Sequence, residues 1–259
     1  MKSVIDCAFE LAQLKKRKAL IPYIMAGYPN LATTEKLVLG LWESEADIIE
    51  LGIPFSDPIA DGPVIQRAAG LALKSGVTLS KVLGLVERLR RKTPVPIVFM
   101  TYYNLIYTYG LAEFASSAHS AGVDGVIIPD LTPEEANPFV REARKNFIDT
   151  IFLVAPTSTP QRLRLASKLT TGFLYYVSMT GVTGAKFSGI NGILGKVKAL
   201  KTLAKKPVAV GFGISTPAEA CSIARAADGV IIGSAVIKAQ ERGGVKAVGR
   251  FIREIRRAI

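Results

Sequence analysis

The sequence predicts an α/β fold, a (β/α)8 TIM barrel, in a single domain with an extra N-terminal helix. Eight short apolar runs alternate with amphipathic, helix-like stretches along the chain. Strands that are apolar throughout are typical of a parallel sheet covered by helices. The count of eight and the length of 259 residues favour a closed barrel over an open sheet, because such barrels commonly use about 250 residues. No linker-like stretch divides residues 1–259, so we expect one domain.

The elements follow one another at regular spacing. The extra helix covers residues 1–18, where apolar side chains recur at helical spacing. The predicted strands are residues 20–27, 47–52, 95–101, 125–129, 149–155, 173–178, 207–211 and 229–232. Helical patterns cover residues 32–45, 64–74, 79–92, 111–121, 190–203 and 245–255.

Local signals predict where two further helices begin. Thr132-Pro133-Glu134-Glu135 and Thr216-Pro217-Ala218-Glu219 each have the form of a capping box with proline at the first helical position. Pro138 should bend or restart the first of these helices, because proline lacks the N–H that a helix interior needs. The aromatic stretch from Tyr102 to Tyr109 is predicted to be a loop.

Composition places the chain among cytoplasmic globular proteins. It is 49% apolar with a mean hydropathy of +0.30, which is ample for a large core. No apolar run reaches the roughly 18 residues that span a bilayer, so we expect no membrane association. The first 18 residues contain acids and lack a continuous apolar core, so they do not form a signal peptide.

The net charge of +12 raises the possibility of a nucleic-acid partner. However, the basic residues are spread through the helix-like segments, and no recognition motif accompanies them. We therefore expect solvated outer faces, no nucleic-acid binding, and a field that favours anionic substrates.

Several chemistries lack their usual sequence signals. The two cysteines, Cys7 and Cys221, have no CxxC spacing and no histidine cluster beside them, so we expect buried thiols and no metal site. No G-x-G-x-x-G follows the first strand and no P-loop is present, which argues against dinucleotide and nucleotide triphosphate chemistry. No lysine lies at a predicted strand end, which argues against a Schiff-base aldolase.

An acid-bearing segment follows the second predicted strand. Glu50 lies in the middle of that strand and faces the side opposite to its two apolar neighbours. An ionised carboxylate there costs several kcal/mol unless it is paired, solvated or protonated. Asp57 and Asp61 follow among prolines and glycines, in the kind of loop where α/β enzymes place their chemistry. A salt-bridged strand end and ordinary turn-forming aspartates remain as alternatives.

Glycine-bearing stretches follow the last three predicted strands: Gly181-Val182-Thr183-Gly184, Gly211-Phe212-Gly213 and Gly233-Ser234. In barrels of this type, the loops after strands seven and eight and a helix N-terminus commonly hold a phosphate. Glycine lets backbone N–H groups approach the anion closely. Turns also need glycine, but the joint placement of these stretches favours a phosphate site.

The acidic segment resembles a family signature. Residues 50–66, ELGIPFSDPIADGPVIQ, closely resemble that of the tryptophan synthase α subunit family. Residues 181–184 and 211–215 resemble the family's phosphate loops, and residues 21–23 resemble its first strand. The similarity covers essentially the whole chain in order.

The resemblance implies an indole-3-glycerol-phosphate lyase of tryptophan biosynthesis, which releases indole and glyceraldehyde 3-phosphate by retro-aldol cleavage. It implies that Glu50 and Asp61 are the catalytic pair. Indole leaves well only when its C3 carries an added proton. Asp61 can stabilise the resulting positive charge at N1 and accept its proton. Glu50 can supply the proton to C3 and accept one from the glycerol hydroxyl.

The resemblance also assigns the remaining site residues. Residues expected to contact the organic part of the substrate are Tyr175, Thr183, Phe212, Met100 and Tyr102. Phosphate-binding residues are expected to be Gly184, Gly213, Gly233 and Ser234. Packing in the core is the alternative for each of the larger side chains.

A partner is implied as well: a β subunit that carries pyridoxal phosphate, in an α2β2 assembly that passes indole internally. This chain itself is expected to need no cofactor. Residues 54–58 and 104–109 are the expected contact surfaces. Some relatives carry arginine where this chain has Met179, which would alter coupling to the partner. The alternatives are another phosphosugar barrel, lyase or isomerase, and a non-catalytic allosteric barrel subunit.

Overall fold

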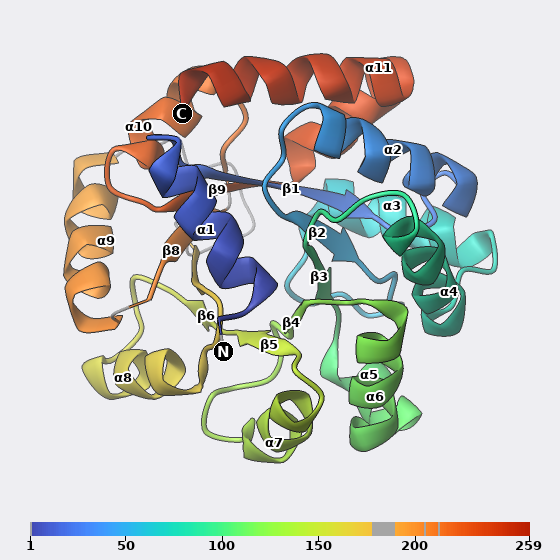
Figure 1. Ribbon diagram of the computed structural model, residues 1–259, viewed down its shortest axis with the longest axis horizontal. Coiled ribbons are helices and arrows are strands. Elements are labelled where there is room, and N and C mark those ends of the chain that lie inside the picture. The colour runs from blue at the N-terminus through green and yellow to red at the C-terminus, as the bar shows by residue number, and fades with distance from the viewer. Residues whose placement is uncertain (1, 178–189, 205, 212) are drawn as a thin grey trace.

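The computed structural model describes residues 2–177, 190–204, 206–211 and 213–259. Its strands form one nine-stranded sheet in the order β5-β4-β3-β2-β1-β9-β8-β7-β6. All of the recorded strand pairs are parallel. Figure 1 shows the strands in the middle of the molecule and the helices arranged around them. The predicted (β/α)8 barrel is therefore confirmed.

The strands are β1 (Ala19–Met25), β2 (Ile49–Gly52), β3 (Ile97–Met100), β4 (Gly125–Ile127), β5 (Asp149–Ile151), β6 (Leu153–Val154), β7 (Leu174–Val177), β8 (Val208–Gly211) and β9 (Gly229–Ile232). Each predicted strand is present. The predicted fifth strand is divided at Phe152 into β5 and β6, which are the two ends of the sheet. Because these two pieces are consecutive in the chain, the sheet closes on itself at Phe152.

The helices are α1 (Val4–Leu14), α2 (Leu31–Glu43), α3 (Pro63–Lys74), α4 (Leu79–Arg90), α5 (Tyr103–Tyr109), α6 (Leu111–Ala121), α7 (Asn137–Lys145), α8 (Pro160–Leu169), α9 (Ile190–Ala204), α10 (Pro217–Ala224) and α11 (Ser234–Ala258). Helix α11 is kinked at Gly243 and Gly244, where the backbone leaves helical geometry. The predicted capping box at Thr216 and Glu219 is present and begins α10.

The predicted capping box at Thr132 is wrong. Residues 133–135 form a turn, and the Thr132 hydroxyl donates to the Glu135 carboxylate instead of capping backbone N–H groups. Helix α7 begins at Asn137, with Pro138 in its first turn. Proline is tolerated there because the first N–H groups of a helix have no partner inside it. Pro138 therefore neither bends nor restarts an earlier helix, contrary to the prediction, but lies in the first turn of α7 itself.

The predicted loop from Tyr102 to Tyr109 is also wrong, because residues Tyr103–Tyr109 form helix α5. The backbone N–H of Tyr103 donates to Asp130 Oδ1 at 2.9 Å, so a side chain from the end of the next strand caps this helix. Gly110 ends α5 with a φ of +97°, a conformation that glycine adopts without strain. Ile106 is the side chain of α5 that the core buries.

The extra N-terminal helix covers the amino-terminal end of the barrel. Ser3 begins α1 with a capping box, and α1 buries Ile5 and Phe9. The ring of Phe9 lies 5.4 Å from that of Phe173. A Cβ added to Gly125 would come within 2.9 Å of Ile5 Cδ1, so the side chain of Ile5 packs directly on this strand residue. Figure 1 shows α1 lying across the strands. The opposite end of the barrel is thereby left as the mouth.

The prediction that the two cysteines are buried is wrong. Cys7 is exposed and Cys221 is partly exposed, and neither is in a disulfide. Cys7 lies on the side of α1 away from the buried Ile5 and Phe9. Helical periodicity alone did not show which side of a shell helix a small side chain occupies.

No single helix among the described residues is long and apolar enough to cross a membrane. Helices α3 and α4 meet that test only as a pair, and they are bent by 95° relative to each other.

A buried carboxylate ties the last helix to the start of the barrel. Asp47 accepts hydrogen bonds from Arg17 Nη2, Arg256 Nη1 and the backbone N–H of Leu20, each at 2.8 Å. Arg256 also donates to the carbonyl oxygens of Lys18 and Ile259. The side chains of Asp47 and Arg256 are only 5% and 6% exposed. Two segments that are far apart in the sequence are thus joined through one buried ion pair.

Removing Asp47 should therefore destabilise the barrel strongly. Asp47→Ala leaves the Arg256 charge buried without its partner, so the free energy of unfolding should fall by about 3 kcal/mol or more. Urea denaturation measures this change. Glu10→Ala, which breaks the exposed Lys2–Glu10 pair, is the control and should cost less than about 1 kcal/mol. Equal losses of unfolding free energy in the two variants would show that the hydrogen bonds of Asp47 do not hold helix α11 to the barrel.

Candidate active site

Glu50 is buried inside the barrel. Its strand neighbours place it directly opposite Tyr23 on β1 and Val98 on β3. In parallel strands, partners in register share a face, so Glu50, Tyr23 and the next-but-one residue Gly52 point the same way. Tyr175, on β7 several strands away in the sheet, has its pKa raised by burial and then by the negative charges of Glu50 and Asp61. These side chains therefore lie near one another in the barrel interior, and Glu50 points inward as the alternation of the second strand predicted.

Asp61 lies in the loop after β2 and is 6% exposed. The hydroxyl of Tyr102 hydrogen-bonds to its carboxylate. The same hydroxyl accepts from the backbone N–H of Ala60 at 3.1 Å. Phe55 stacks on the Tyr102 ring, with centroids 5.1 Å apart. Tyr102 therefore holds both the backbone and the acid of this loop over the mouth of the barrel.

The two acids share unusual electrostatics. Burial raises the pKa of Glu50 to about 8, and the nearby charge of Asp61 adds to this rise. Burial raises the pKa of Asp61 to about 6, although the hydrogen bond from Tyr102 opposes the rise. Glu50 Oε2 and Asp61 Oδ1 are buried and have no hydrogen-bond partner among the described residues. Near pH 7, Glu50 is mostly protonated and Asp61 is mostly ionised, which is the pattern of an acid–base pair.

Two other predicted residues lie around the same interior. Tyr175 is buried on β7, and its hydroxyl is 2.4 Å from where a Cβ of Gly211 would be, so only glycine fits there. Met100 ends β3 in register with Gly52, so it shares the inward face. Thus Met100, Tyr102 and Tyr175 line the space to which the acids belong.

The described phosphate candidates follow β8 and β9. Gly213 has a φ of +81°, which glycine accepts freely. Gly233 is the N-cap of α11, and Ser234 is the first residue of that helix. A Cβ on Gly233 would lie 3.7 Å from Tyr23 Cβ, so this corner adjoins the strand beside Glu50. The predicted residues Thr183, Gly184 and Phe212, and also Met179, lie outside the described residues.

Sequence reasoning missed one residue of this interior. Tyr23 is 3% exposed, and its hydroxyl is 2.1 Å from where a Cβ of Gly52 would be. Burial raises its pKa well above the usual value, and the charges of Asp61 and then Glu50 raise it further. The sequence showed Tyr23 only as part of an apolar strand. Its register opposite Glu50 depends on how β1 and β2 pair, which no local pattern reveals.

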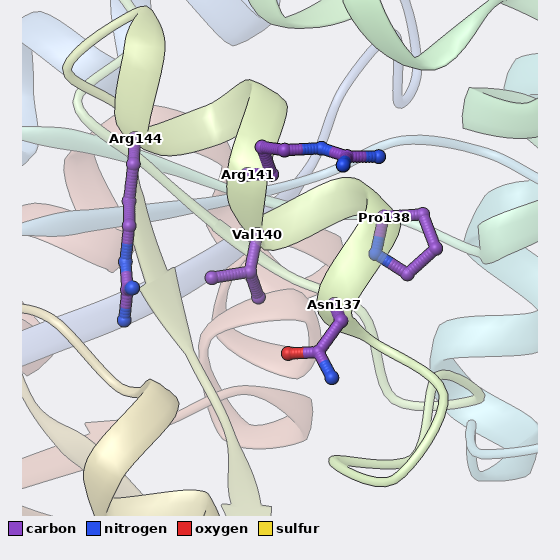
Figure 2. Close-up of a pocket in the computed structure, with 5 residues that line it drawn as sticks. All are labelled: Asn137, Pro138, Val140, Arg141 and Arg144. Carbon is purple, nitrogen blue, oxygen red and sulfur yellow. The ribbon is translucent and has the colours of Figure 1, made fainter.

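A shallow depression on the outer shell is unrelated to this interior. Asn137, Pro138, Val140, Arg141 and Arg144 of helix α7 line it. In Figure 2 the guanidinium groups of Arg141 and Arg144 point away from one another, so they do not converge on an anion. Among the described residues, no group of three or more histidine, cysteine, aspartate or glutamate side chains could hold a metal ion.

The fold is that of a TIM-barrel enzyme, and two buried carboxyls, those of Glu50 and Asp61, lie close to one another in it. A family model described as tryptophan synthase alpha chain matches residues 9–254. The chain therefore belongs to the tryptophan synthase alpha chain family, as the signature after Glu50 predicted. Members of this family cleave indole-3-glycerol phosphate, which is a lyase reaction.

Individual relatives agree over nearly the full length. The chain is 49% identical to the tryptophan synthase alpha chain of Geobacter sulfurreducens over 254 residues, which is 96% of each protein. It is 49% identical to that of Geotalea daltonii over 92% of this chain and 90% of the relative. The structure resembles tryptophan synthase subunit alpha of Legionella pneumophila with a TM-score of 0.92 at 37% identity, covering 100% and 99% of the two chains. A chain of Mycobacterium tuberculosis tryptophan synthase gives the same values.

The buried acid should lower stability in a pH-dependent way. Because the pKa of Glu50 is about 8 in the folded chain and about 4.5 when unfolded, folding favours its protonated form. The wild type should therefore lose stability relative to Glu50→Gln as pH rises from about 4.5 to about 8, by a few kcal/mol. Urea denaturation at pH 5, 7 and 9 measures how much the free energy of unfolding of Glu50→Gln exceeds that of the wild type. The exposed Glu43→Gln variant should show no such trend, and a pH-independent gain in Glu50→Gln would contradict the assignment.

Proposed function

We propose that Glu50 and Asp61 of this chain catalyse the retro-aldol cleavage of indole-3-glycerol phosphate to indole and glyceraldehyde 3-phosphate. The observation that supports this most is the pairing of two buried carboxyls whose pKa values, about 8 and about 6, bracket neutrality. One acid is then ready to give a proton while the other is ready to stabilise a positive charge.

The steps follow from these protonation states. Protonated Glu50 donates its proton to C3 of the indole ring, and the positive charge that forms at N1 is stabilised by ionised Asp61. Glu50, now a carboxylate, takes the proton of the hydroxyl on the carbon attached to the ring. The C–C bond breaks, its electron pair restores the neutral ring, and the O–H pair forms the aldehyde carbonyl. Glu50 ends protonated, so the pair is ready for the next turnover.

Binding of the phosphate would position the substrate for this chemistry. We assign the phosphate to Gly213, Gly233 and Ser234, with Gly184 as a further expected contact. Gly233 and Ser234 form the N-terminus of α11, and a helix N-terminus favours an anion. Held there, the substrate would extend toward Met100 and Tyr102, which would wall the ring together with Phe212. Tyr175 would lie beside the glycerol chain, and Thr183 would help to enclose it.

We further propose that the chain works as one domain in the cytoplasm and assembles with a tryptophan synthase β subunit as α2β2. Pyridoxal phosphate would belong to that subunit, which would receive indole internally. Two large apolar side chains after neighbouring strands support a contact surface at the mouth. Ile59 is 78% exposed and Tyr107 is 68% exposed. A non-catalytic role for the barrel is not favoured, because both acids are present and buried.

The pH dependence of turnover tests the acid–base pair. The value of kcat/KM for indole release should be highest between about pH 6 and about pH 8, because Asp61 must be ionised and Glu50 protonated. Glu50→Gln should lower kcat by about 10³-fold or more, while Glu43→Gln should leave it unchanged. Undiminished turnover in Glu50→Gln would show that Glu50 is not the catalytic proton donor.

The apolar mouth should be required for assembly. Ile59→Asp should weaken binding to a β subunit by at least tenfold, because it places a charge in an apolar contact, and sedimentation velocity measures this. Leu14→Asp is the matched control. Leu14 is 80% exposed on α1, at the other end of the barrel. If both variants bind the β subunit as the wild type does, the contact surface lies elsewhere.

A further inference from the structure

The tyrosine that sequence reasoning missed lies beside the reacting acids. Tyr23 is in register with Glu50 on the neighbouring strand. Its hydroxyl lies over Gly52, which is two residues nearer the carboxyl end of β2 than Glu50. The hydroxyl is thus on the mouth side of Glu50, so a ligand that reaches Glu50 from the mouth passes it.

The hydroxyl is available to such a ligand. It makes no hydrogen bond to any described residue. Burial and the charges of Asp61 and Glu50 keep it protonated, so it can act only as a neutral O–H group at any ordinary pH. Glu50 Oε2 and Asp61 Oδ1 likewise have no partner among the described residues. Two unpaired carboxyl oxygens therefore lie near the Tyr23 hydroxyl.

Packing alone does not explain the hydroxyl. A phenylalanine ring would fill nearly the same volume, so the hydroxyl is not needed for packing. The unpaired oxygens of Glu50 and Asp61 beside it are of the kind found where a ligand completes the hydrogen bonding.

The position of Tyr23 indicates which part of the substrate its hydroxyl would contact. Tyr23 contacts the region of Gly233, at the phosphate corner, and also faces the two acids. The glycerol chain must run between these places, because it joins the ring to the phosphate. On the basis of the proposed function, we propose that the Tyr23 hydroxyl donates a hydrogen bond to the glycerol oxygen that becomes the aldehyde oxygen.

This donor acts where charge develops. When Glu50 removes the hydroxyl proton, negative charge builds on that oxygen before the carbonyl is complete. Glu50 cannot donate to it at that moment, because it is accepting the proton. A neutral O–H group beside it stabilises the developing charge, and one such donor in a dry site typically contributes 10²–10³ in rate.

Tyr23→Phe tests the proposal, with two ligands. We expect kcat for indole-3-glycerol phosphate to fall about 10²-fold, with KM changed less than threefold. Inhibition by indole-3-propanol phosphate, which keeps the ring and the phosphate but lacks both hydroxyls, should be unchanged. The unfolding temperature should not fall, because no hydrogen bond between described residues is lost.

The matched control is Tyr176→Phe. Tyr176 is buried on β7, its hydroxyl also lacks a partner among the described residues, and it faces the side opposite to Tyr175. This variant should keep full turnover.

Three results would contradict the proposal. Full kcat in Tyr23→Phe, alongside an inactive Glu50→Gln, would overturn the role of the hydroxyl and leave the proposed function intact. Equal weakening of substrate and of indole-3-propanol phosphate would show that Tyr23 only shapes the site. Full turnover in Glu50→Gln would overturn the proposed function itself, and the inference with it.

Discussion

Burial of the Glu50 carboxyl inside the barrel is the constraint on which this site depends. A carboxyl that is 1% exposed cannot be hydrated when ionised, so its pKa rises to about 8. Nothing among the described residues pairs with Glu50 Oε2. The chain thus keeps a polar group in an unfavourable place, which most proteins avoid unless the group has a function. The same feature that lowers stability at high pH makes Glu50 a proton donor at neutral pH.

The rest of the fold excludes water from the Glu50 carboxyl and fixes its orientation. Helix α1 closes the far end of the barrel through Ile5 and Phe9, so Glu50 faces only the mouth. Tyr102 fixes the loop that carries Asp61, so a second acid is held above the first. The closest approaches are made possible by glycine, as where the Tyr23 hydroxyl occupies the space above Gly52. Stability comes from elsewhere, including the buried pair of Asp47 and Arg256.

Much of this could be predicted from the sequence, and the failures share a cause. Apolar runs located every strand, and the period of two placed Glu50 inward, because both signals are local. The helix at Tyr103 was missed because its cap, Asp130, comes from the turn after β4. The helix start predicted at Thr132 was wrong because the Thr132 hydroxyl bonds to the Glu135 side chain and not to a backbone N–H group. Tyr23 was missed because register between strands is a property of the whole barrel. The positions of Thr183, Gly184 and Phe212 remain predictions.

Catalysis as proposed requires that Glu50 is a neutral acid at physiological pH while Asp61 is ionised. Carbon-13 NMR of carboxyl-labelled protein, assigned with the Glu50→Gln and Asp61→Asn variants, measures both titrations directly. We expect Glu50 to titrate near pH 8 and Asp61 near pH 6. Titration of Glu50 near pH 4.5, as for a glutamate in water, would contradict it.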